Sequence, residues 1–169
     1  MRWIWIDKFI DFQSGKRAVA VKNVTLAEEH LHDHFPGFPV MPECLMIEAM
    51  AQTAGILVGE ARAFKEKVIL AKIQKAVFFD FVRPGDSIQL EAAIESISPE
   101  AAGTHGRITR EDHLIAEIDL IFSHIDQNLA GVSFPRENFV FDNGTFQSLL
   151  REFTSAGRDS GQEAKGVHG

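Results

Sequence analysis

Residues 34–52 read HFPGFPVMPECLMIEAMAQ, a proline-rich loop that runs directly into an apolar segment. The three prolines, Pro36, Pro39 and Pro42, lack a backbone N–H, so they exclude a helix within the loop and stiffen it. Pro42 suits the first position of a helix, and the segment after it stays almost uniformly apolar to about Phe64. Because a helix that is apolar on all sides must be buried, this stretch predicts a long central helix wrapped by other structure.

On both sides of this helix the sequence has the character of β-strands. Upstream, segments 2–12 and 16–24 are expected to form two strands, followed by a polar helical turn at 26–31. Downstream, apolar and polar residues alternate, and further strands are expected at 68–82, 88–95, 101–110 and 114–123. One long buried helix and at least five antiparallel strands predict an α+β domain in which a curved sheet wraps the helix.

The 169 residues fit one such domain, expected over residues 1–126. Residues 127–154 are expected to form a C-terminal extension that contains a short amphipathic helix. Its apolar residues at helical spacing are Phe146, Leu149, Leu150 and Phe153. Residues 155–169 carry four glycines and almost no apolar side chains, which predicts a flexible tail.

Composition excludes several classes of function. A formal net charge of -7 argues against nucleic acid as the main partner, because phosphate binding needs a cationic surface. The longest nearly charge-free stretch, 44–59, contains Glu48 and is too short for a membrane span. The single cysteine, Cys44, and the absence of a leader pattern favour a cytoplasmic location. The chain has no tyrosine, so its chemistry must come from His, Asp, Glu, Lys or Cys.

Two residues of the opening stretch form a candidate acid–base pair. His34 lies in the stiff loop, and Glu48 is the only charged residue between Cys44 and Gly59 of the predicted helix. Histidine accepts a proton near neutral pH, whereas a carboxyl group shielded from water retains its proton and can donate it. Free N–H groups at the helix start, around Glu43 and Cys44, are suited to hold a developing oxyanion.

Plainer interpretations of the same residues stay open at this point. Glu48, Gln52, Gly55 and Gly59 lie on one stripe of the helix, which is equally compatible with a solvated face. A histidine beside a Pro-Gly turn is commonly a hydrogen-bonded loop residue rather than a catalyst.

Two other signals are weaker. His30, His32 and His34 alternate like metal ligands, but their spacing does not match that of zinc hydrolases, so no metal is expected. Cys44 is interpreted as a small core residue rather than a nucleophile.

The segments His34-Phe-Pro-Gly37, Pro39-Val-Met-Pro42 and Glu48-Ala-Met-Ala-Gln52, at this spacing, closely resemble the active-site segment of the FabZ- and FabA-type (3R)-hydroxyacyl-[acyl-carrier-protein] dehydratases. The resemblance continues through residues 15–25 and 83–86 and covers roughly residues 3–126. The family fold is the hotdog, a long helix wrapped by an antiparallel sheet, in agreement with the fold predicted from the residues.

The resemblance implies that a (3R)-3-hydroxyacyl thioester loses water to give a trans-2-enoyl thioester, in fatty acid or related acyl-chain biosynthesis. By position, His34 takes the α-proton and Glu48 protonates the departing β-hydroxyl, and in the family these two residues meet across a dimer interface. No metal and no redox cofactor are required. The further residues expected at the substrate, including the walls of an acyl tunnel and a hydrogen-bonding glutamine, are Gly37, Phe38, Glu43, Cys44, Met46, Met50 and Gln52.

The resemblance also implies partners. These are acyl carrier protein, which carries the substrate as a phosphopantetheine thioester, and further copies of the chain in a dimer or a trimer of dimers. Five basic residues form a cationic cluster. It is interpreted either as an ordinary solvated surface or as the docking patch for the acidic carrier protein. Its members are Arg62, Lys65, Lys67, Lys72 and Lys75.

The chain departs from the family pattern at two positions. The family usually has glycine where this chain has Glu43, and the N–H at that position helps to bind the thioester carbonyl. The N–H is retained, but a carboxylate turned inward would repel an enolate. Asp33 replaces a small residue before His34. A hotdog thioesterase and a non-catalytic protein that binds acyl thioesters or their carrier are therefore the alternatives to a dehydratase.

Overall fold

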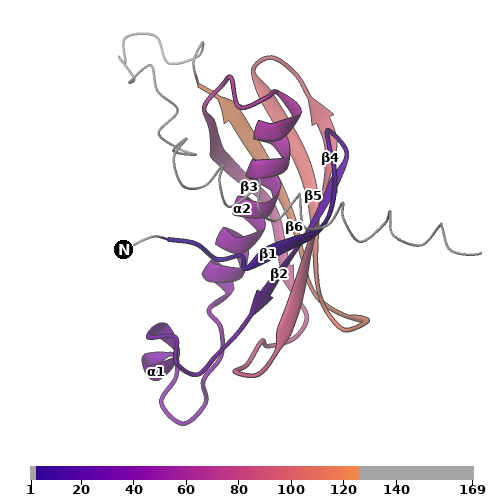
Figure 1. Cartoon of the computed structure of the whole chain (residues 1–169). Helices are drawn as coiled ribbons and strands as arrows, with labels where there is room; N and C mark the ends of the chain where they lie inside the picture. The colour runs from indigo at the N-terminus through magenta and orange to yellow at the C-terminus, as the bar shows by residue number, and fades with distance from the viewer. Residues whose placement is uncertain (1–2, 126–169) are drawn as a thin grey trace, which may run out of the picture.

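The computed structural model describes residues 3–125, which form a six-stranded sheet, one long helix and one short helix (Figure 1). The elements in chain order are β1 (Lys8–Gln13), β2 (Arg17–Asn23), α1 (His30–Asp33), α2 (Glu43–Ala61), β3 (Val68–Phe78), β4 (Ser87–Ile97), β5 (Ala101–Arg110) and β6 (His113–His124). The predicted extension at 127–154 and tail at 155–169 lie outside the described residues.

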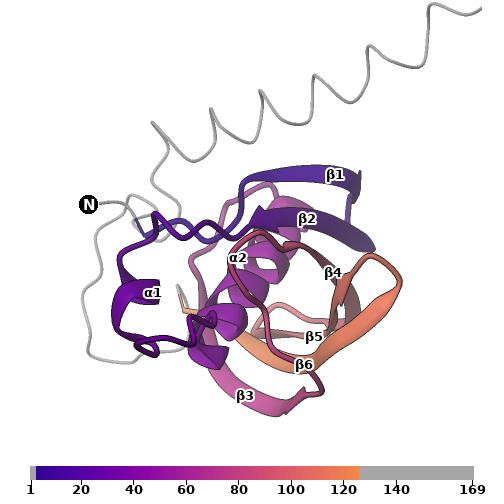
Figure 2. The same cartoon turned by 90° about the horizontal axis from the view of Figure 1, so that it is seen from below.

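The sheet is antiparallel throughout, with strand order β1-β2-β4-β5-β6-β3. Register shifts interrupt four of its five strand pairs, and such irregularities increase the local twist and bend of strands. The curved sheet wraps around α2 when the molecule is viewed along the helix (Figure 2). The predicted α+β hotdog architecture is therefore confirmed.

The boundaries differ from the sequence prediction where long-range contacts intervene. The first strand begins at Lys8 rather than near residue 2, because the Trp5 N–H donates to the side chain of Gln52 instead of to a neighbouring strand. Pro42 precedes α2 as its cap, and the helix ends at Ala61. The short helix α1 lies later in the chain than the predicted turn at 26–31.

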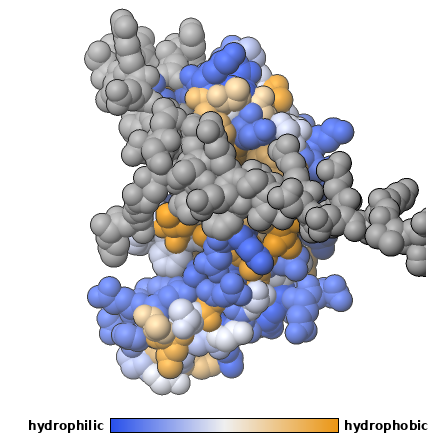
Figure 3. All heavy atoms as spheres, in the orientation of Figure 1, coloured by the Kyte–Doolittle hydropathy of each residue, from blue (hydrophilic) through white to orange (hydrophobic). Residues whose placement is uncertain are grey.

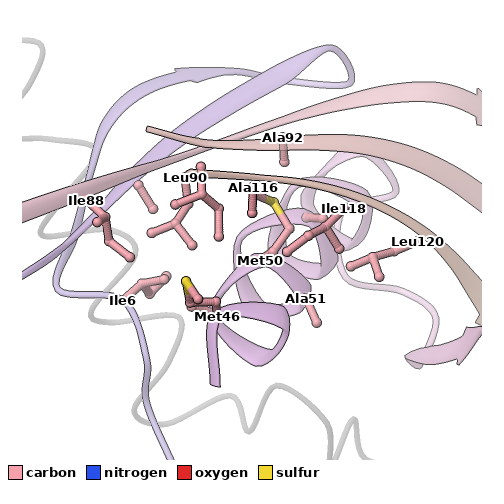
Figure 4. Close-up of a cluster of buried hydrophobic side chains, with 14 of the residues drawn as sticks. Ile6, Met46, Met50, Ala51, Ile88, Leu90, Ala92, Ala116, Ile118 and Leu120 are labelled. Atoms are coloured by element: carbon pink, nitrogen blue, oxygen red, sulfur yellow. The ribbon is translucent and has the colours of Figure 1, made fainter. Parts of the chain in front are cut away.

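The core lies between α2 and the concave face of the sheet (Figure 4). Met46 and Met50 point from the helix toward strand residues and are fully buried. Met50 packs so closely on Gly106 of β5 that a Cβ there would lie 2.5 Å from its Sδ atom. Glycine at this position therefore lets the helix and the sheet approach each other.

By length and composition alone, α2 is apolar enough to cross a membrane. In the structure, 67% of that window is buried inside the fold, as expected for the core helix of a domain.

Candidate active site

The loop that carries His34 is closed by its own backbone. Phe35 and Phe38 exchange two hydrogen bonds, of 3.0 and 2.9 Å, and the Val40 N–H donates to the His34 carbonyl at 2.9 Å. Gly37 adopts a φ of 76° in the turn, a conformation that favours glycine. These hydrogen bonds all join residues within a span of seven, and they give the loop a defined shape.

The same loop determines which ring nitrogen of His34 can accept a proton. Nδ1 lies 3.0 Å from the carbonyl oxygen of Val40. Since a carbonyl oxygen only accepts, Nδ1 must carry the proton and donate it, which leaves Nε2 of the neutral ring as an acceptor. The side chain is half-buried, and the Phe35 ring stacks on it at 4.0 Å. The arrangement is suited to a general base that acts through Nε2.

Glu48 is held by a different kind of contact. The Gln52 Nε2 donates to Glu48 Oε1 and to the Trp3 carbonyl, each at 2.8 Å, and Gln52 Oε1 accepts from the Trp5 N–H at 2.8 Å. The two backbone groups fix the orientation of the glutamine amide, because one only donates and the other only accepts. Oε1 of Glu48 therefore receives a hydrogen bond, and Oε2 is the oxygen suited to carry an acidic proton.

The start of α2 offers two further donors. Leu45 and Met46 donate their N–H groups to the Pro42 carbonyl, at 2.9 and 3.2 Å. The N–H groups of Glu43 and Cys44, the first two residues of α2, have no such partner among the described residues. Both residues are exposed, so the interpretation of Cys44 as a small core residue is wrong. These N–H groups, at the positive end of the helix dipole, are suited to an oxyanion.

Not all predicted site residues lie together in one chain. No hydrogen bond or ion pair joins His34 to Glu48 within the described part of the chain. Met46 and Met50 are core residues, whereas Phe38 is 42% exposed. The guanidinium of Arg83 lies 4.6 Å from the centre of the Phe38 ring. The tunnel-wall roles stay predictions.

The stripe of α2 that includes Glu48 is not a solvated face. Gly55 and Gly59 are buried, and Glu48 and Gln52 are half-buried beneath the N-terminal segment. Sequence reasoning missed Trp3 and Trp5 as the groups that hold Gln52. No local signal was present, since these contacts join residues 47 and 49 positions apart.

The structure separates the members of the cationic cluster at 62–75 and of the group of three alternating histidines. Arg62 pairs with Glu66 and Lys75 with Glu117, and Lys67 is buried, so Lys65 and Lys72 are the exposed members of the cluster without an ion pair in the described chain. The three histidines have separate surroundings: Nε2 of His30 lies 3.7 Å from Glu28 Oε2, His32 contacts the Leu26 carbonyl, and His34 contacts that of Val40. No group of three potential metal ligands was found among residues 3–125.

Apolar side chains are exposed near the His34 loop. At the end of the molecule that carries α1, a hydrophobic patch interrupts a largely hydrophilic surface (Figure 3). Phe35 of the loop is 55% exposed, and Phe81, whose ring contacts that of Phe38, is 52% exposed.

Comparison with known proteins adds two findings from sequence. Residues 3–119 match the family model described as a FabA-like domain. The chain is 40% identical over 121 residues to the 3-hydroxyacyl-[acyl-carrier-protein] dehydratase FabZ of Caldanaerobacter subterraneus subsp. tengcongensis, covering 71% of this chain and 86% of the relative. It is 38% identical over 125 residues to the FabZ of Listeria monocytogenes serotype 4b, covering 73% and 87%.

Solved structures share the fold at low identity. The conserved protein PA5202 from Pseudomonas aeruginosa has a TM-score of 0.59 at 16% identity, covering 70% of this chain and 87% of its own. The dehydratase heterocomplex ApeI:P from Xenorhabdus doucetiae has a TM-score of 0.59 at 14% identity, covering 73% and 84%. These similarities support the fold alone.

Proposed function

The chain belongs to the FabA-like domain family, and from this membership we propose that it dehydrates (3R)-3-hydroxyacyl thioesters of acyl carrier protein to trans-2-enoyl thioesters. It is then a hydro-lyase of fatty acid or related acyl-chain biosynthesis that acts in the cytoplasm. The observation that carries the proposal is that the side chains of His34 and Glu48 have opposite hydrogen-bonding states. His34 keeps an accepting Nε2, and Glu48 receives a bond at Oε1 and keeps Oε2 for a proton.

The reaction follows from these atoms. His34 Nε2 takes the proton from the α-carbon of the substrate, and the negative charge that develops on the thioester oxygen is held by the N–H groups of Glu43 and Cys44. Glu48 gives its Oε2 proton to the β-hydroxyl, and the carbon–oxygen bond breaks to release water. The electron pair of the broken C–H bond becomes the new double bond. Transfer of the proton from His34 back to Glu48, directly or through the released water, restores the enzyme.

We propose that each site is completed by a second copy of the chain. The absence of contact between His34 and Glu48 within one described chain supports a site that takes each residue from a different subunit. Strand β3 is one edge of the sheet, and apolar side chains are exposed along it. They are Leu70, Ile73 and Val77, at 38%, 47% and 36%. An apolar edge strand is a natural surface for pairing with another chain.

Glu43 need not oppose this chemistry. Its side chain is exposed at the first position of α2 and has no hydrogen-bond partner among the described residues. A solvated carboxylate is screened by water and salt, whereas its backbone N–H keeps its direction. Lys65 and Lys72 remain the candidates for contact with an acidic carrier protein.

The test is to incubate the purified protein with (3R)-3-hydroxyacyl carrier protein and follow the ultraviolet absorbance of the enoyl thioester. Release of free thiol is measured in the same reaction. A dehydratase raises the absorbance and releases no thiol. A thioesterase releases thiol without the absorbance change. If neither signal changes while the acylated carrier binds, the chain is a binding protein and the proposal is wrong.

A further inference from the structure

The His34 loop packs on the β3–β4 connector, which consists of residues 79–86. At the end of the loop, the Met41 N–H donates to the Val82 carbonyl of the connector at 2.8 Å, and both residues are buried. The hydrogen bonds inside the loop give it its shape. Its place on the molecule depends instead on this bond and on the packing of Phe38.

Phe38 is the loop side chain that contacts the connector. Its ring meets the Phe81 ring edge to face, with 5.8 Å between centroids, and the Arg83 guanidinium lies 4.6 Å from its centre. Both contacts are attractive, because the face of an aromatic ring carries partial negative charge. Phe38 and Phe35 exchange two backbone hydrogen bonds, and the Phe35 ring stacks on that of His34. A shift of Phe38 therefore reaches the imidazole through one intervening residue.

The backbone attaches the connector mainly at its two ends. The Phe79 N–H donates to the Ile115 carbonyl at 2.8 Å, and the Asp86 carbonyl accepts from the Val24 N–H at 2.9 Å. Between these ends, no backbone hydrogen bond joins residues 80–83 to a strand within the described chain. The position of this middle stretch therefore depends on side chains.

Arg110, the last residue of β5, supplies that support. Its Nη1 donates to the Phe81 carbonyl at 3.0 Å and to Asp86 Oδ2 at 2.9 Å, and its Nη2 donates to Asp80 Oδ2 at 2.8 Å. The same Asp86 oxygen accepts the Arg83 N–H at 2.8 Å. One guanidinium thus binds the connector at three residues, among them a neighbour of the Phe38 ring.

The chemistry of this contact favours arginine. The Phe81 N–H and the Arg110 guanidinium hold the pKa of Asp80 below its ordinary value, so the carboxylate stays ionised at neutral pH. Arginine presents several N–H donors in one plane, whereas the lysine ammonium is a point charge on a flexible stem. His113 Nε2 lies 3.6 Å from Asp80 Oδ2 but makes no hydrogen bond to the connector among the described residues. Arg110 is therefore the side chain suited to orient the connector.

We propose that Arg110 is a positioning residue for the base of the reaction. By orienting the connector it sets the place of Phe38 and, through Phe35, that of the His34 ring. Arg110 acts through the loop and not on the substrate. This inference rests on the proposed dehydration, in which His34 Nε2 takes the α-proton.

Kinetics of the full-length protein test the consequence for the base. Arg110→Met keeps the apolar stem and removes the guanidinium, so kcat should fall about tenfold with KM within about twofold, because the displaced group is needed in the transition state. Arg110→Lys retains the charge and should recover part of the loss. Arg107→Met is the matched control: Arg107 is exposed on the same strand and has no ion-pair partner among the described residues, so kcat should stay at the wild-type value.

Hydrogen exchange of two neighbouring amides tests the route without requiring activity. The Met41 N–H binds the connector, whereas the Val40 N–H binds the His34 carbonyl inside the loop. In Arg110→Met, exchange of the Met41 amide should become about tenfold faster while that of Val40 changes by less than about twofold, measured by ¹⁵N-resolved NMR. Arg107→Met should change neither rate.

Three outcomes overturn the proposal when Arg110→Met has a native circular dichroism spectrum. They are a wild-type kcat, an unchanged exchange rate at Met41, and equal acceleration at Met41 and Val40, which would mean that Arg110 supports only the stability of the loop. Arg110→Lys undergoes the same measurements if Arg110→Met does not fold. A wild type that forms no enoyl thioester refutes the proposed function instead, and the exchange rates then decide alone whether Arg110 sets the place of the loop.

Discussion

His34 and Glu48 are held in position by two different parts of the molecule. The histidine belongs to a loop whose hydrogen bonds join residues within a span of seven, including the bond from Nδ1 to the Val40 carbonyl. The glutamate belongs to a buried helix, and its oxygen is held by Gln52, which is itself bound by the N-terminal segment 47 to 49 positions away. The proposed base is thus held mainly by local hydrogen bonds, and the proposed acid by long-range contacts.

This difference explains how far the sequence could predict the site. Prolines and a Pro-Gly turn have local consequences, so the stiff loop and the helix after it were predictable. The alternation of apolar residues likewise predicted the strands of the sheet. The pairing of Trp3 and Trp5 with Gln52 depends on tertiary packing alone. For that reason the first strand was predicted to begin too early. Cys44 was expected in the core because it begins an apolar segment, but it is exposed at the start of α2.

The largest effect on kcat is expected from substitution of Glu48, the proposed acid. Glu48→Gln removes the acidic proton but keeps an oxygen that can accept from Gln52, so kcat should fall by about 10²–10⁴-fold while the unfolding free energy changes by less than ~0.5 kcal/mol. Enoyl thioester formation and thermal unfolding measure the two quantities. Glu60→Gln, near the other end of α2, is the matched control and should retain wild-type kcat. Full activity of Glu48→Gln would show that Glu48 is not the proton donor.

Gln52→Ala should break the long-range positioning of the acid without touching the base. The three hydrogen bonds of its amide are lost, and we expect the unfolding free energy to fall by about 1–3 kcal/mol. The value of kcat should fall by about 10–100-fold with KM nearly unchanged, because the displaced group is needed in the transition state. A fall in stability with unchanged kcat would show that Gln52 supports only the fold.

The local positioning of the base is probed at Gly37. Its φ of 76° is strained for any side chain, although a Cβ would meet no atom within 4 Å. Gly37→Ala should therefore cost about 1 kcal/mol of stability and lower kcat by displacing His34. Gly15→Ala is the control, because Gly15 has a φ of 68° in the turn between β1 and β2, and a Cβ there would meet only Ala61, at 4.0 Å. Equal loss of kcat in both variants would contradict local control of the base.

The smallest effect is expected at Glu43. Because its side chain is exposed and its N–H is the group proposed to act, Glu43→Gly should change kcat by less than about threefold. The same dehydration assay measures it. An inert wild type together with an active Glu43→Gly variant would mean that the chain is a dehydratase scaffold used for binding.

Complementation between two inactive variants tests most directly whether the locally held base and the distantly held acid come from different subunits. His34→Ala and Glu48→Gln chains, carrying different affinity tags, are co-expressed, and the mixed dimer is isolated through both tags. Each variant alone should be inactive. The mixed dimer should recover about half of the wild-type rate, because in a two-fold dimer one of its two shared sites keeps both residues. A mixed dimer as inactive as its parents, with wild type active under the same conditions, would contradict a shared site.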